Sequence, residues 1–307
     1  MFPILYMSIP DKLKPAVDFI ARNQRTIGFV GLALFLLWFA LYPTWPTPDR
    51  LFIGLVFGFM AAGATWDGFK KFAPFVTLLL VYESFRGVAD DLNSRVEYTW
   101  MIKMDEWMFG GTLPTKTLQD WFYAGTTSWY DVALYIVYMM HFVLPFLLAF
   151  LIWKYREKIY WHYAISILTV SFMGFITFAA FPAAPPWMAE RDGYIDGTVH
   201  VTDGVWEKLG LADIPSLYEN FSPNPVAAVP SLHAAYATLL LIFAWTAFGK
   251  KWGMITAIYP FLIYVGTTYL GEHYFIDEII GALYAVAAYY LAAWFIKKFQ
   301  SRKKKKA

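Results

Sequence analysis

The sequence predicts an all-α integral membrane protein, a multi-span helical bundle with about eight transmembrane helices. Of its 307 residues, 59% are hydrophobic and 16% are charged, whereas soluble domains carry about 25% charged residues. The apolar residues are gathered in long runs, and a helix needs about 20 of them to cross a bilayer. Lys and Arg residues concentrate in alternate loops, which is typical of a chain that crosses a membrane repeatedly.

Eight apolar segments are predicted as transmembrane helices. They are residues 26–42, 51–66, 72–88, 132–153, 162–181, 231–248, 254–270 and 275–296. We expect residues 1–71 to hold a cytoplasmic segment and two added helices. Residues 72–296 should form a six-helix core, and residues 297–307 a basic cytoplasmic tail.

The positive charges predict the orientation. With both termini in the cytoplasm, the basic residues of the N-terminal segment, of the loops at 70–71, 154–158 and 250–251, and of the tail all fall inside. The basic tail also accounts for the formal net charge of +2. This charge therefore indicates topology and contact with anionic lipids, and we expect no nucleic-acid partner. The protein should be a multi-pass protein of the cell membrane or an endomembrane.

Two long segments should lie on the outer side. Residues 89–131 are rich in aromatic and polar residues and should include interfacial helices. Residues 182–230 are rich in proline and glycine and should form a loop cap over the outer face. The absence of cysteine excludes disulfides, thiolate metal ligands and a Cys nucleophile. The apolar stretch after Met1 is too short for a signal peptide, so the first hydrophobic span should remain as an anchor.

Three ionisable residues mark a candidate active site. Insertion of an ionisable group in a membrane span costs about 2.5–3.5 kcal/mol, so such a residue indicates a functional or structural role. His233 begins the sixth predicted span, and His273 and Asp277 begin the eighth, on the same outer face. Their spacing of four places His273 and Asp277 on one helix face. A carboxylate at one imidazole nitrogen makes the other nitrogen a better nucleophile or base.

A second histidine from another helix can then protonate a leaving oxygen. Ser231 and the backbone amides at a helix start are suited to holding phosphate oxygens. Either histidine alone fits a structural polar residue between helices equally well. Their common depth and the His/Asp pair favour catalysis.

The motifs around these residues resemble a known family. Pro230-Ser231-Leu232-His233 and His273-x-x-x-Asp277 are similar to two signatures of the type 2 phosphatidic-acid phosphatase superfamily. The closer resemblance is to its inositol phosphotransferase-like branch, the fungal inositol phosphorylceramide synthases and their prokaryotic relatives. It also involves the segments at 182–187, 225–230 and 269–274, and extends over approximately residues 72–296.

The resemblance implies a phosphatase-like core and a metal-independent mechanism without a cofactor. His273 would attack phosphorus to form a phosphohistidine, Asp277 would orient it, His233 would be the general acid, and Ser231 would contact the phosphate. The substrate would be a lipid phosphate or phospholipid, and the acceptor either water or an alcohol. The site would open to the extracytoplasmic or luminal side.

The chain departs from the superfamily at its cationic positions. Gly266-Thr267-Thr268 stands where a Ser-Arg pair usually precedes the histidine, and the first signature, a Lys followed by Arg-Pro, is missing. Its counterpart is the segment 82–90, which makes Arg86 the first candidate for a phosphate ligand and Arg95 the second. Alternatively, Arg86 forms a local salt bridge with Glu83 or Asp90.

Other polar residues have weaker assignments. Glu272, His141 and Tyr269 are candidates for contacts with the acceptor or the pocket. His141 also fits an interhelical hydrogen bond, and Glu272 a solvated residue at headgroup level. His162 and His200 are expected to be structural.

Two other functions use the same cluster. His233, His273 and Asp277 are the right types for a zinc hydrolase, although no further ligand pattern exists. A transporter could use them as a proton relay, but no internal repeat is visible.

Overall fold

The computed structural model describes residues 12, 14–42, 48–64, 66–86, 89, 92–210 and 224–304. Several predicted features fall partly outside these residues: the start of the N-terminal segment, Asp90, part of the predicted cap, and the end of the basic tail. Within the described ranges no strand forms, and only two isolated bridges pair Glu97 with Ala183 and Ala183 with Ala227. The all-helical prediction is confirmed for this part of the chain.

Most of the described residues belong to helices. In chain order they are α1 (Lys14–Leu41), α2 (Pro48–Ala61), α3 (Trp66–Arg86), α4 (Thr99–Met108), α5 (Pro114–Phe122), α6 (Trp129–Met139), η3 (Met140–Phe142), α7 (Leu144–Arg156), η4 (Glu157–Ile159), α8 (Tyr160–Ala180), α9 (Pro186–Arg191), α10 (Val201–Leu209), α12 (Leu232–Phe248), α13 (Lys250–Thr256), α14 (Ile258–Leu270) and α15 (Phe275–Lys304).

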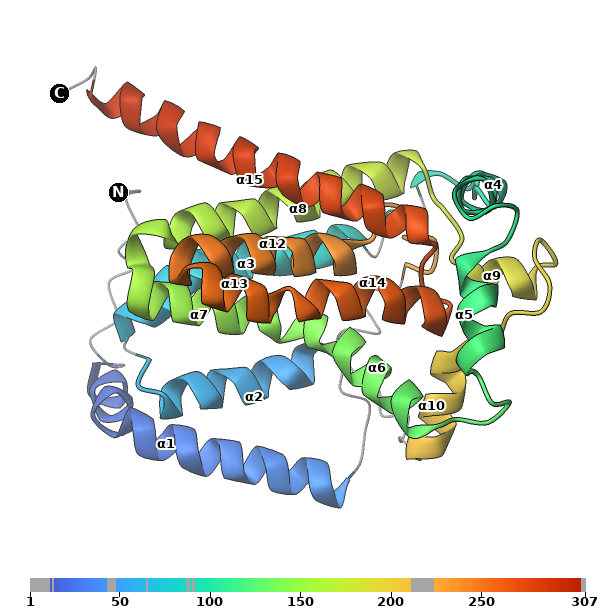
Figure 1. Cartoon of the computed structure of the whole chain (residues 1–307). Helices are drawn as coiled ribbons and strands as arrows, with labels where there is room; N and C mark the ends of the chain where they lie inside the picture. Colours follow the sequence, from blue (N-terminus) through green and yellow to red (C-terminus); the bar gives the residue numbers. More distant parts are fainter. Residues whose placement is uncertain are drawn as a thin grey trace.

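Four described stretches are helices long and apolar enough to cross a membrane. They are Lys14–Leu41, Leu144–Ala180, Lys250–Leu270 and Phe275–Arg302. The third of these stretches contains both α13 and α14. Leu144–Ala180 contains α7 and α8, which fold back on each other through η4 (Figure 1). Helix α12 and the stretch Arg50–Ala61 of α2 are apolar but shorter. Every predicted span overlaps a helix, while the number of crossings stays a prediction.

Two predicted spans are interrupted helices. The segment 132–153 divides into α6, η3 and α7, and the segment 254–270 divides into α13 and α14. Pro145 lies at the start of α7 and Pro260 near the start of α14. Proline has no N–H to donate to the preceding turn, so each residue explains the end of the helix before it.

The short helices gather at one end of the bundle. Figure 1 shows α4, α5, α9 and α10 together, opposite the end at which α1 begins and α15 finishes. Helices α9 and α10 lie within the segment predicted as a loop cap, so its described part is partly helical. The side of the membrane that each end of the bundle faces stays a prediction.

The core lies between α3, α7, α8, α12 and α15. Its largest buried side chains include Phe75, Tyr82, Tyr163 and Phe243. Helix α15 presents small residues to this core: Gly281, Ala285, Ala288 and Ala292 recur at helical spacing, and the three alanines are fully buried. Small side chains let helix backbones approach closely in membranes.

Gly281 marks the closest of these approaches. A Cβ atom there would lie 2.2 Å from the carbonyl oxygen of Ser231, the residue before α12. The backbone N–H of Ser231 also donates to the carbonyl oxygen of Asp277 at 3.1 Å. The start of α12 is therefore held against the first turns of α15.

Candidate active site

Two histidines from separate parts of the chain meet at the end of the bundle where α15 begins. The Nδ1 atom of His233, in the first turn of α12, lies 3.2 Å from the Nε2 atom of His273, which precedes α15. His273 is buried, with 6% of its surface exposed. The sequence predicted only a common depth, and the structure brings the two rings into contact.

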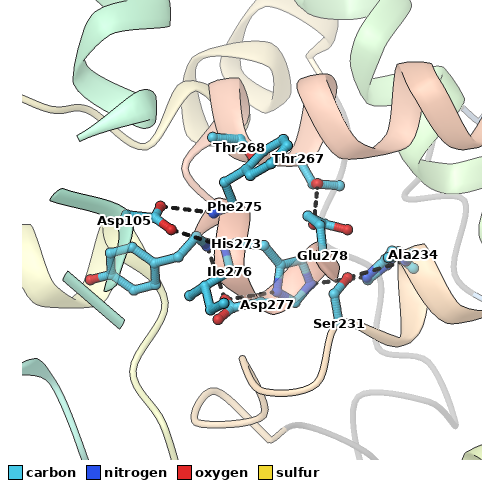
Figure 2. Close-up of polar contacts among 12 residues, drawn as sticks. Asp105, Ser231, Ala234, Thr267, Thr268, His273, Phe275, Ile276, Asp277 and Glu278 are labelled. Atoms are coloured by element: carbon cyan, nitrogen blue, oxygen red, sulfur yellow. Dashed lines mark hydrogen bonds and ion pairs between the residues drawn. The ribbon is translucent and has the colours of Figure 1, made fainter. Parts of the chain in front are cut away.

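Asp277 lies on the other side of the His273 ring. Its Oδ2 atom is 3.6 Å from Nδ1 of His273 and accepts a hydrogen bond from the backbone N–H of Tyr274 at 2.9 Å (Figure 2). The first distance suits an ion pair but is too long for a hydrogen bond. Asp277 is fully buried. Its charge favours a proton on Nδ1, which leaves the Nε2 lone pair facing His233.

Ser231 caps α12. Its hydroxyl oxygen accepts a hydrogen bond from the N–H of Ala234 at 3.2 Å, and the residue is fully buried (Figure 2). An N-cap satisfies one of the otherwise unpaired amides of a helix start. Ser231 therefore orients the turn that carries His233.

An acidic residue of α4 holds the start of α15. Asp105 accepts hydrogen bonds from the backbone N–H groups of Phe275 at 2.8 Å and Ile276 at 2.9 Å (Figure 2). Burial raises the pKa of Asp105 to about 7. Sequence analysis missed this residue, because nothing in its own segment indicates which distant amides it binds.

The turn before His273 is fixed by two further contacts. Gly271 ends α14 with φ at 86°, a left-handed conformation that suits glycine. Its carbonyl oxygen accepts from the N–H of Trp187 at 3.1 Å. The side-chain amide of Gln119 donates to the carbonyl oxygen of Tyr269 at 2.8 Å. Helices α5 and α9 therefore help to position the nucleophile candidate.

Glu272 does not line the cavity and instead pairs with His200. Its Oε1 atom lies 3.0 Å from Nε2 of His200 and accepts from the hydroxyl of Thr202 at 2.6 Å. On its other side, Nδ1 of His200 lies 2.9 Å from Asp203. Burial opposes charge on both groups, but their hydrogen bond and mutual attraction prevail. The pKa of His200 is therefore raised, and the pKa of Glu272 is lowered.

A cavity of about 100 Å³ adjoins the two histidines. Its lining comprises Tyr82, Glu83, Arg86, Tyr138, His141, Phe142, Phe178, Ala227, Leu232, His233, Tyr236 and His273. Arg86 and Glu83 enter from the last turn of α3 and form a salt bridge, with Nε to Oε2 at 3.1 Å. The salt bridge with Glu83 that was given as the alternative for Arg86 is therefore present, and its role as a phosphate ligand stays a prediction. Arg95 is exposed and outside this lining.

His141 is a third imidazole at this cavity. Its ring stacks on Tyr236, with centroids 4.6 Å apart, and contacts the ring of His233 at 4.2 Å. Its Nδ1 atom is buried and has no hydrogen-bond partner. The expected interhelical hydrogen bond is therefore not formed by this nitrogen.

The other candidate polar residues have structural contacts. The hydroxyl of Tyr269 donates to Asp131 at 2.6 Å, away from the cavity lining. The Nε2 atom of His162 lies 2.9 Å from the carbonyl oxygen of Tyr289. Glu278, beside Asp277, is fully buried and accepts from the hydroxyl of Thr267 at 2.6 Å (Figure 2). Thr267 belongs to the segment that replaces the family's Ser-Arg pair.

No group of three His, Cys, Asp or Glu residues in the described part of the chain is arranged to hold a metal ion. In this geometry the two histidines face each other, and His273 also faces the carboxylate of Asp277. It therefore suits transfer of a group to Nε2 of His273 and of a proton at His233.

The sequence, fold and site identify the class of protein. The chain belongs to the PAP2 superfamily, whose family model matches residues 99–291. This match includes His233, His273 and Asp277, whereas α3 and Arg86 precede it. The suspected resemblance is confirmed, and the protein is a membrane protein of this superfamily.

Sequence relatives indicate the branch of the superfamily to which the chain is similar. The chain is 28% identical over 221 residues to the phosphoinositol dihydroceramide synthase of Bacteroides thetaiotaomicron, covering 68% of this chain and 71% of that protein. It is 26% identical over 223 residues to the inositol phosphorylceramide synthase of Candida albicans, covering 70% and 46%. It is also 26% identical over 227 residues to the catalytic subunit of inositol phosphorylceramide synthase of Saccharomyces cerevisiae, covering 72% and 55%. The chain thus spans about half the length of these fungal relatives. No solved structure matches it.

Proposed function

We propose that the protein is a lipid phosphotransferase that moves a phospho-alcohol headgroup, of the inositol-phosphate type, from a phospholipid to an alcohol acceptor. The contact between Nδ1 of His233 and Nε2 of His273 at 3.2 Å supports this most directly. It joins the candidate nucleophile to the candidate proton donor. The names of the relatives favour transfer to a ceramide-like alcohol over hydrolysis.

In the first step, the lone pair on Nε2 of His273 forms a bond to phosphorus. The bond from phosphorus to the oxygen of the lipid alcohol breaks, and that oxygen takes a proton from His233. Asp277, at 3.6 Å from Nδ1, stabilises the positive charge that grows on His273. General acid catalysis of this kind contributes about 10²–10⁴-fold to the rate.

In the second step, the acceptor hydroxyl attacks phosphorus and returns a proton to His233. The bond between phosphorus and Nε2 breaks, which regenerates the enzyme. Water in place of the alcohol gives hydrolysis by the same route. Exclusion of water from the space around His233 and His273 therefore decides between transfer and hydrolysis.

The negative charge on the phosphoryl oxygens requires positive partners. Arg86 lines the cavity and can supply this charge, because a guanidinium stays protonated and presents five N–H donors in a fixed arrangement. The start of α12 adds the backbone dipole of a helix N-terminus. Ser231 completes the proposed phosphate contacts.

The site is proposed to face the extracytoplasmic or luminal side. The predicted positions of the basic loops support cytoplasmic termini, and α15 runs from the site toward the basic tail. A lipid donor would then enter from the outer leaflet. Attachment of a reporter that is reactive from only one side of sealed vesicles would test this orientation.

The main test uses purified full-length protein in vesicles with a phosphorus-labelled inositol phospholipid and a ceramide. The wild type should transfer label to the ceramide after exhaustive chelation and form an acid-labile phosphoenzyme. His273→Ala should remove both signals, and His233→Ala should slow transfer by about 10²–10⁴-fold. His162→Gln is a matched control, because it replaces a half-buried histidine that does not line the cavity. Undiminished transfer by His273→Ala would refute the proposal.

A further inference from the structure

A carboxylate lines a cavity that is proposed to hold a phosphate. Glu83 shares this lining with Arg86, His233 and His273. A site for phosphate alone needs hydrogen-bond donors, whereas a carboxylate accepts hydrogen bonds and repels an anion. The family's first signature is cationic, yet this chain carries Glu83 in the corresponding segment. Glu83 is therefore suited to a part of the ligand other than its phosphate.

His141 belongs to the same cavity. It lies in η3, where the 3₁₀ turn interrupts the helical path from α6 to α7. Stacking on Tyr236 and contact with His233 fix its ring, and 9% of its surface is exposed. A buried nitrogen without a partner costs free energy, which a ligand hydroxyl can recover on binding. Neither transfer step above requires His141.

We propose that Glu83 and His141 form a subsite that recognises the hydroxyl groups of a neutral polyol on the donor phosphate. This inference rests on the proposed function and assigns the side chains that recognise the headgroup of its donor. Glu83 accepts hydrogen bonds, and a neutral imidazole donates from one nitrogen and accepts at the other. A polyol offers both donors and acceptors.

The charges favour a neutral polyol over an ammonium headgroup. The guanidinium of Arg86 lies 3.1 Å from the Glu83 carboxylate and offsets its negative charge. An ammonium group would therefore meet a cation beside the carboxylate. Hydroxyl groups can bind to such an ion pair without adding a net charge.

Binding measurements on the full-length protein in detergent test headgroup recognition independently of catalysis. Three probes are titrated: myo-inositol 1-phosphate, inorganic phosphate and phosphoethanolamine. The wild type should bind the inositol phosphate about tenfold more tightly than either other probe, because sites built for hydroxyls reject analogues that lack them. Glu83→Gln and His141→Phe should each reduce this preference to less than about threefold.

Binding of inorganic phosphate shows whether each variant is still folded. Affinity for inorganic phosphate should stay within about threefold of the wild type, since the phosphate contacts remain. His141→Asn should recover part of the preference, because its amide can place a polar atom near the position of Nδ1. His162→Gln should keep the full preference, because His162 bonds to Tyr289 and does not line the cavity.

Three outcomes would overturn the subsite. The wild type could bind all probes equally, the variants could lose affinity for all probes in parallel, or phosphoethanolamine could bind most tightly. A parallel loss would mean that Glu83 acts only through Arg86. Retained transfer by His273→Ala would overturn the proposed function instead and would leave the binding preference unaffected.

Discussion

The Nδ1 atom of His233 lies 3.2 Å from the Nε2 atom of His273. Two protonated imidazoles at this distance would repel each other, so the resting pair carries at most one positive charge. A phosphoryl group bonded to Nε2 also cannot fit between the two nitrogens. Binding of the donor must therefore shift one ring or bring phosphorus in beside the His233 ring.

The pH dependence of transfer should reflect His273. Burial opposes its charged form, but contact with Asp277 and the charge of Glu278 prevail, so the pKa of His273 is raised above 6.5. The nucleophile must be neutral, so kcat/KM should rise with pH through this raised value. Asp277→Asn should move that limb to lower pH and reduce kcat by about 10²–10⁴-fold. A pH–rate profile of both proteins tests this, and an unmoved limb would contradict it.

Asp105→Asn should weaken the start of α15. Asn keeps one acceptor oxygen and directs an NH₂ group at the second backbone N–H, so one of the two hydrogen bonds is lost. Losing a helix cap costs about 0.5–2 kcal/mol. The variant should therefore unfold at a lower temperature in detergent and should transfer the headgroup more slowly than the wild type. Asp120→Asn, at an exposed position of α5, should change neither property, and equal behaviour of the two variants would argue against this role.

The pair of His200 and Glu272 should make stability depend on pH. The raised pKa of His200 means that its contribution is complete below about pH 6.5 and is lost as pH rises through the folded value. The lowered pKa of Glu272 means that its contribution is lost as pH falls through its own folded value. His200→Gln should therefore lower the unfolding temperature more at about pH 6 than at about pH 9. A constant difference between the two proteins would exclude this linkage.

Gly281→Ala should separate α12 from α15. The added Cβ would meet the carbonyl oxygen of Ser231 at 2.2 Å. Overpacking of this kind costs about 1–3 kcal/mol, and it should also displace His233 from His273. We expect transfer to fall by about tenfold or more. Gly58→Ala in α2 meets nothing within 4 Å and is the matched control. Wild-type transfer by Gly281→Ala would show that the close approach is not needed.

Much of the site could be predicted from local spacing and topology. The interval of four residues aligns His273 with Asp277, and the positive-inside pattern places His233 at the same depth. Asp105 could not be found in this way, because its partners lie 170 and 171 residues away in the sequence. Glu272 was ambiguous for a similar reason, since His200 reaches it from the segment expected to be a loop.

The basic candidates show a second limit. Arg86 and Arg95 are both outward cations in the sequence, and only the packing of α3 distinguishes them. Arg86 ends a helix whose buried face enters the core, and it lines the cavity, while Arg95 lies exposed beyond that helix. Composition and periodicity carry no information about this difference.

The hydrogen bonds from Phe275 and Ile276 to Asp105 connect a helix at the membrane surface to the candidate active site. Helix α4 carries the exposed aromatic residues Trp100 and Trp107, which suit the lipid headgroup layer. A sideways movement of α4 in that layer would pull on the amides of Phe275 and Ile276, just after His273 in the sequence. Through this link, the thickness and lateral pressure of the surrounding bilayer can affect the position of Nε2 of His273.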